Sequence, residues 1–214
     1  MPSPNIVKSF TNKHFYHIYN RGVEKRTIFN DDLDYRVFLQ QFSLLLSSQN
    51  LDEDSPLHVL RPRRPNFSKT IKLIAYCLMP NHFHLLLCQL STYGISEFMR
   101  SATTSYVGYF NKRNNRVGGL FQGPFKATHI DNDIYLKHIS RYIHLNPSAV
   151  GEDYGRYKYS SLRYYDSATC PDWLKPDPVL ELFKDSQEYT DFLADYSTNS
   201  AQLLGSTTLD DEDL

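Results

Sequence analysis

Residues 71–89 contain two apolar, β-prone runs separated by Pro80 and Asn81, and this stretch constrains the fold more than any other part of the chain. Proline and asparagine are typical of tight turns, so the runs at 71–79 and 82–89 predict a β-hairpin. Both strands are apolar except for a few polar residues, among them two histidines at the start of the second strand.

His82 and His84 are separated by one residue. Because successive side chains of a strand point to opposite faces, the two imidazoles share a face, with Cα atoms roughly 6.6 Å apart. Phe83 and Leu85 are expected to pack on the other face. The spacing suits a divalent metal, but a buried histidine is more often a core residue with satisfied hydrogen bonds. A metal site therefore needs support from elsewhere in the chain.

Hydrophobic periodicity and turn residues place the other elements of the fold. We expect a strand at 14–22, a helix at about 33–48 and a long proline-broken connection at 47–69. A helix that starts at about residue 95 and ends in the basic run 112–116, a strand at 125–130 and a helix at about 134–146 that Pro147 ends should follow. The order strand, helix, strand, strand, helix, strand is the split β-α-β of a ferredoxin-like fold. We predict an α+β chain: an antiparallel sheet with helices on one face, an extra helix and a C-terminal helical extension.

The net charge of −1 is the sum of a basic part and an acidic part of the chain. Residues 1–163 contain 21 Lys and Arg against 12 Asp and Glu, whereas residues 164–214 contain 2 against 12. A basic body fits a polyanionic partner such as nucleic acid, although proteins without such a partner also show a modest positive excess. We divide the chain into a domain at 1–165 and an acidic extension at 166–214, partly helical with a disordered end.

Three cysteines, at spacings that match no zinc motif, favour a reducing cytoplasm. The first residues lack the apolar core of a signal peptide, and no apolar run approaches the roughly 20 residues needed to cross a bilayer. We expect a soluble cytoplasmic protein.

A second group of polar residues lies in the last predicted helix, in the run Tyr142-Ile-His-Leu-Asn146. Tyr142 and Asn146 are four residues apart and project from the same face, roughly 6 Å apart at Cβ. With His82 and His84 they offer two imidazole nitrogens, one amide oxygen and one phenol. Such a charge-poor set leaves positions for water and a phosphate oxygen, as a catalytic metal site requires. The apolar stripe beside Tyr142 equally fits an ordinary core tyrosine.

Several motifs, in this order along the chain, resemble those of the single-tyrosine HUH transposases of the IS200-like family, and most closely the REP-associated tyrosine transposases. They are Asn20-Arg-Gly22, Tyr76-Cys-Leu-Met-Pro-Asn81 followed by His82-Phe-His84, Gly119-Leu-Phe-Gln-Gly123, Arg141-Tyr-Ile-His-Leu-Asn-Pro147 and Tyr159-Ser-Ser161. The resemblance covers roughly residues 14–165.

The resemblance implies cleavage and joining of single-stranded DNA next to small hairpins. Tyr142 would attack the scissile phosphate and form a covalent 5′-phosphotyrosine, while His82, His84 and Asn146 would hold Mg²⁺ or Mn²⁺. Tyr135 is the nearest alternative nucleophile. Two further hypotheses remain: a noncatalytic hairpin-DNA-binding protein on the same scaffold, and a zinc hydrolase or nucleotide-binding protein. The last of these would need a third histidine or a carboxylate near His84.

Basic side chains of the body are candidate contacts for DNA phosphates, and neighbouring aromatic rings are candidate stacking partners for unpaired bases. The candidates are Arg21, Arg61, Arg63, Arg64, Lys112, Arg113, Arg116, Lys126 and Arg141. The sequence leaves open whether the Tyr142 helix acts within its own chain or is exchanged in a homodimer.

Overall fold

The computed structural model describes residues 10–48, 65–167 and 169–195. Four antiparallel strands form one sheet in the order β2-β3-β1-β4. Their bounds are Phe15–Arg21 for β1, Ile71–Met79 for β2, His82–Gln89 for β3 and Lys126–Ile130 for β4. This order and the helices that connect the strands confirm the predicted ferredoxin-like α+β fold.

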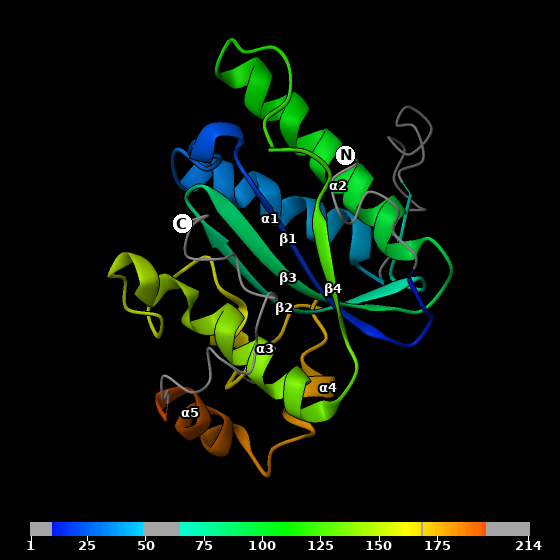
Figure 1. Ribbon diagram of the computed structural model, residues 1–214, viewed down its shortest axis with the longest axis vertical. Helices are drawn as coiled ribbons and strands as arrows, with labels where there is room; N and C mark the ends of the chain where they lie inside the picture. The colour runs from blue at the N-terminus through cyan, green and yellow to red at the C-terminus, as the bar shows by residue number, and fades with distance from the viewer. Residues whose placement is uncertain (1–9, 49–64, 168, 196–214) are drawn as a thin grey trace, which may run out of the picture.

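The helices lie on both sides of this sheet (Figure 1). Helices α1 (Asp32–Leu46) and α2 (Gly94–Arg113) cover one face. Helix α3 (Asp133–Leu145) covers the other, together with α4 (Asp177–Leu180) and α5 (Ser186–Ala194). Because the sheet is covered on both sides, all eight residues of β3 are buried. Its two histidines therefore lie inside the protein, on the face that α3 covers.

A β-bulge in the hairpin decides which side chains of β2 reach that face. The register between β2 and β3 shifts between Leu73 and Ala75. Leu73 and Tyr76 consequently belong to the core under α1 and α2, whereas Ile74 and Ala75 both belong to the core under α3. Side chains along a strand alternate between the two faces of the sheet, so one extra residue moves the side chains that follow it to the opposite face.

Helix α3 begins at a side-chain cap and ends in a tighter turn. The Asn132 side chain accepts a hydrogen bond from the backbone N–H of Tyr135 at 2.8 Å, which satisfies one of the free donors at the helix start. The α-helix ends at Leu145, one residue before the predicted end, and a 3-10 helix continues over Asn146–Val150. Pro147 lacks an N–H group and cannot extend the α-helical hydrogen bonds, but it is accepted in the first turn of the new helix.

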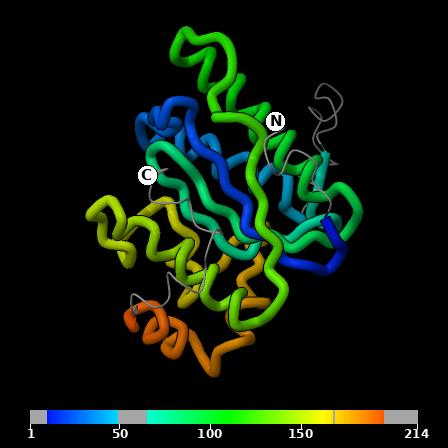
Figure 2. Tube along the Cα trace, in the orientation of Figure 1, coloured from blue at the N-terminus to red at the C-terminus, as the bar shows by residue number. Residues whose placement is uncertain are grey.

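The described part of the C-terminal extension packs on the sheet and on α3 (Figure 2). The backbone N–H of Lys175 donates to the carbonyl of Leu73 at 2.8 Å, next to a parallel bridge between Leu73 and Leu174. The predicted disordered end of the chain lies outside the described residues. None of the helices in the described segments is long and apolar enough to cross a membrane.

A buried polar network joins this extension to α3. His144 is fully buried, with Nδ1 2.6 Å from the Tyr189 hydroxyl on α5 and Nε2 2.7 Å from Ser161 Oγ. The same Oγ accepts a hydrogen bond from the backbone N–H of Tyr76 at 2.8 Å. Helix α3 is thus fixed by polar contacts to β2 and to α5 at the turn that follows Tyr142.

Replacing Tyr189 with Phe should reduce the free energy of unfolding by about 1–3 kcal/mol, because Nδ1 of the buried His144 loses its partner. Urea denaturation followed by circular dichroism measures the difference. Tyr93→Phe is the matched control, since that side chain is 66% exposed and should change the stability by less than about 0.5 kcal/mol. Equal stabilities of the two variants would show that the network does not fix α3.

Candidate active site

Strand β3, helix α3 and the 3-10 helix that follows α3 bring four of the predicted site residues together. His82 and His84 have ring centroids 5.0 Å apart. The Tyr142 ring lies edge-on to the His84 ring, with centroids 5.3 Å apart and an interplanar angle of 82°. Asn146 follows one helical turn later and contacts His82. The strand and helix halves of the predicted site therefore meet within one chain.

His82 is held by an asparagine at each ring nitrogen. Its Nδ1 lies 2.6 Å from Asn81 Oδ1, and its Nε2 lies 3.0 Å from Asn146 Oδ1. An amide oxygen only accepts hydrogen bonds, so the neutral ring donates to one of the two oxygens at a time. When the proton is on Nδ1, Asn81 accepts it, and both Nε2 and Asn146 Oδ1 have lone pairs for another ligand.

His84 is oriented by a histidine of the neighbouring strand. Its Nδ1 lies 2.9 Å from His17 Nε2, and the two rings stack with centroids 5.1 Å apart. His84 Nε2 is buried and has no hydrogen-bond partner among the described residues. A buried nitrogen in this position either costs free energy or binds a ligand.

Burial keeps both imidazoles neutral. It lowers the pKa of His82 to about 4, against a smaller raising effect of the hydrogen bond with Asn146, and the charge of Arg21 adds to the decrease. Burial likewise holds the pKa of His84 well below its ordinary value. Metal ligands must be deprotonated to bind, and these histidines meet this condition at neutral pH.

The residues fit a divalent metal in chemistry and in spacing. His82 Nε2 and Asn146 Oδ1 are 3.0 Å apart, about the separation of two adjacent ligands at roughly 2.1 Å from an octahedral ion. The unpartnered His84 Nε2 is the third donor. No group of three His, Cys, Asp or Glu side chains in the described segments is arranged to hold a metal. The candidate donors are two histidine nitrogens, His82 Nε2 and His84 Nε2, and the amide oxygen of Asn146.

Two predicted DNA contacts lie on the same face of the sheet as the histidines. In the strand register, Arg21 is directly opposite His82, and Tyr19 is opposite both His84 and Lys126. Directly paired residues of antiparallel strands share a face. Arg21 is 4% exposed, whereas Lys126 is exposed, with its Nζ 5.8 Å from the centre of the Tyr19 ring.

The other candidate DNA contacts are distributed differently. Arg113 pairs with Asp31 and Asp34 at 2.5 Å, so it joins α2 to the start of α1. Arg141 is 3% exposed and donates to the carbonyl of Phe192 at 3.0 Å, a structural contact with α5. Lys112 lies in the last turn of α2 and is exposed, and Arg116 lies three residues after the end of this helix and is half-buried. Arg61, Arg63 and Arg64 lie outside the described residues.

His17 and Asn81 belong to this site, and reasoning from the sequence missed their roles. The alternation in the first strand places His17 on one face, and the ferredoxin-like order places that strand beside β3. These two facts together would have predicted a contact between His17 and the metal-site face. Asn81 was interpreted as a turn residue, and nothing in the turn pattern shows that its side chain contacts His82.

Known protein families and solved structures were found to resemble parts of the chain. The family model described as "Transposase IS200 like" matches residues 65–146, which include β2, β3, α2, β4 and α3. All four residues of the candidate site, from His82 to Asn146, fall within the matched segment. No curated protein sequence matches the chain.

Two solved structures resemble the chain at 13% sequence identity. One is described as a REP-associated tyrosine transposase bound to a REP hairpin, and the match has a TM-score of 0.53 and covers 75% of this chain and 83% of that one. The other is described as a putative transposase from Deinococcus radiodurans R1, with a TM-score of 0.39 and coverage of 64% and 93%. At this identity the first match supports the fold alone, and no argument rests on the second.

Proposed function

We propose that the chain, whose residues 65–146 match the IS200-like transposase model, cleaves and joins single-stranded DNA next to hairpins through a covalent bond to Tyr142. One observation carries the proposal. The Tyr142 ring lies 5.3 Å from the ring of His84, beside the paired His82 Nε2 and Asn146 Oδ1 atoms. A phenol next to neutral donor atoms is the arrangement that nucleophilic attack on a metal-bound phosphate needs.

In the proposed reaction, the Tyr142 hydroxyl oxygen attacks the phosphorus of the scissile phosphodiester. A bond forms between this oxygen and phosphorus, the bond from phosphorus to the 3′ oxygen breaks, and the proton lost by the phenol is balanced by the proton that the freed 3′ oxygen gains. One phosphodiester replaces another, so the step needs no external energy source. Attack by a 3′-hydroxyl of another strand reverses the step and joins the two strands.

A tyrosine hydroxyl has a pKa of about 10 in solution and is a weak nucleophile at neutral pH, so the protein must position it well. Helix α3 contributes this positioning, because its next turn is fixed by His144 on two sides. His82, His84 and Asn146 would hold Mg²⁺ or Mn²⁺, which draws charge from a nonbridging phosphate oxygen when bound.

The proposal is tested with single-stranded oligonucleotides that contain short hairpins and carry a label on the 3′ side of the expected cut. We expect a protein-DNA adduct that survives denaturing electrophoresis in Mn²⁺ or Mg²⁺ and is absent in EDTA. The noncatalytic alternative predicts equal hairpin binding with and without EDTA, and no adduct under any condition. That second result would refute the proposal.

Replacing His17 with Phe should weaken Mn²⁺ binding by about 10- to 100-fold, because His84 then loses the hydrogen bond that orients its ring. Titration of free Mn²⁺ by electron paramagnetic resonance measures the affinity without any reaction. His14→Phe, at the partly exposed position before β1, is the matched control and should leave Mn²⁺ affinity within about twofold of the wild-type value. Equal affinities for the two variants would mean that His17 does not act through His84.

A further inference from the structure

Arg21, the last residue of β1, is a charged side chain in the interior that forms no ion pair with an acid of the described segments. It is 4% exposed, and its Nε and Nη1 atoms have no hydrogen-bond partner among the described residues. None of the ion pairs found there includes it. Burying a charge without a partner costs free energy. A guanidinium stays protonated even when buried, so it cannot avoid this cost by losing its charge.

The backbone around Arg21 is fixed on both sides. Its N–H donates to the Asn20 side chain at 2.9 Å, and its carbonyl accepts from the N–H of Gln122, also at 2.9 Å. The next residue, Gly22, donates to the carbonyl of Asn81 at 2.9 Å. A Cβ at Gly22 would lie 2.2 Å from the carbonyl oxygen of Arg26, so only glycine fits this bend. The fold therefore fixes the backbone from which the buried Arg21 side chain projects.

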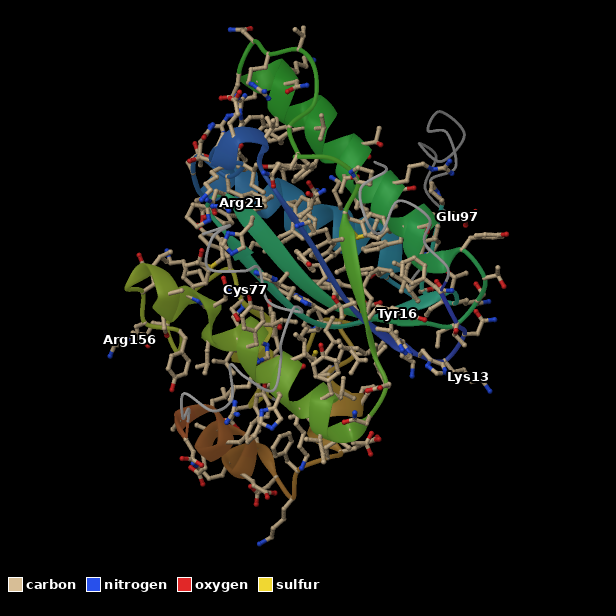
Figure 3. All side chains as sticks on the ribbon, in the orientation of Figure 1. Lys13, Tyr16, Arg21, Cys77, Glu97 and Arg156 are labelled. Atoms are coloured by element: carbon tan, nitrogen blue, oxygen red, sulfur yellow. The ribbon has the colours of Figure 1, made fainter. Side chains whose placement is uncertain are left out.

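Arg21 lies at the edge of the candidate active site. Arg21 is directly opposite His82 in the strand register and close enough for its charge to influence that imidazole. Figure 3 shows Arg21 at the end of the sheet where β1 leaves it and β3 begins. A guanidinium is planar and offers two donor edges, one formed by Nε and Nη2 and one by Nη1 and Nη2, and either edge matches two oxygens of a phosphate.

We propose that Arg21 is a phosphate clamp that binds the scissile phosphodiester of DNA together with the metal site, so that phosphate and metal bind cooperatively. This inference rests on the proposed function, because it assigns a ligand to the same site. Without an anion, Arg21 and a divalent metal on His82, His84 and Asn146 repel each other. A phosphate between them is attracted to both, so each cation should raise the affinity of the site for the anion and the anion should raise the affinity for the metal.

The experiment measures Mn²⁺ affinity of the full chain by electron paramagnetic resonance, with and without inorganic phosphate as the probe. In the wild-type protein, phosphate should tighten Mn²⁺ binding by about 5- to 150-fold, the usual range of coupling between two ligands. In Arg21→Gln, Mn²⁺ should bind more tightly than to the wild-type protein when phosphate is absent, and phosphate should add little. A decrease in Mn²⁺ affinity without phosphate, or an undiminished phosphate effect, would overturn the proposal.

Arg156→Gln is the matched control, because it removes the same charge from an exposed position away from the sheet, labelled in Figure 3. It should leave both affinities at the wild-type values. If Arg21→Gln fails to fold, Arg21→Lys keeps the charge but loses the planar fork, and an undiminished phosphate effect in that variant overturns the clamp in the same way. Neither measurement involves DNA cleavage. If phosphate does not tighten Mn²⁺ binding but the Tyr142 adduct still forms, the clamp is refuted and the proposed reaction is not. If phosphate tightens Mn²⁺ binding but no adduct forms, the proposed reaction is refuted and the clamp is not.

Discussion

Tyr142→Phe should abolish the covalent protein-DNA adduct and reduce strand cleavage by at least about 10⁴-fold, the order of effect seen when a nucleophile is removed. The substitution deletes one oxygen atom and keeps the ring. The edge-on contacts with His84 and His17, at 5.3 and 5.9 Å between centroids, remain available to the Phe ring. We therefore expect an unchanged fold and hairpin affinity within about twofold of the wild-type value, measured by gel shift in EDTA.

Tyr135→Phe is the matched control for this variant. Tyr135 is the alternative nucleophile on the same helix, two turns before Tyr142, and it packs at the edge of the core under α3. The control should form the adduct at the wild-type rate. If Tyr142→Phe forms the adduct and Tyr135→Phe does not, the assignment of the nucleophile is wrong.

His84→Gln should reduce the rate of cleavage by about 10²- to 10⁴-fold. A metal ion stabilises charge on a reacting phosphate by several kcal/mol, and each 1.36 kcal/mol corresponds to a factor of ten in rate. The His84 side chain has no exposed surface, so a much smaller residue would leave a destabilising cavity. Glutamine is close to histidine in size and keeps this cavity small. Single-turnover cleavage at several Mn²⁺ concentrations measures the rate and shows whether excess metal restores part of it.

His129→Gln is the control for His84→Gln. His129 is an exposed histidine of β4, opposite Tyr16 in the register and therefore on the other face of the sheet. Its cleavage rate should equal that of the wild-type protein. A rate for His84→Gln within about tenfold of the control would mean that His84 contributes no metal ligand.

Local sequence patterns predicted much of the fold because the elements follow physical rules that act over short distances. The apolar runs at 71–79 and 82–89 with a turn between them became β2 and β3 at the predicted positions. The alternation that placed His82 and His84 on one face is confirmed, because Phe83 and Leu85 lie in the core on the other face.

Contacts between distant segments could not be predicted in this way. The register between β2 and β3 shifts near Leu73, and no local pattern in the sequence predicts this shift. The contact of His17 with His84 depends on which strand neighbours β3. The burial of Arg141 depends on α5, which lies some fifty residues further along the chain. Arginines were therefore the least predictable residues, because a surface contact, a structural contact and a ligand site look the same in the sequence.

The most direct test of the proposed reaction is mass spectrometry of the adduct. Wild-type protein is incubated with hairpin oligonucleotide and Mn²⁺, digested with trypsin and nuclease, and searched for peptides that carry a nucleotide. We predict a nucleotide joined through its 5′-phosphate to Tyr142, formed with Mn²⁺ and absent in EDTA. Cleaved DNA with no modified peptide, or a nucleotide joined to a residue other than Tyr142, would contradict the account.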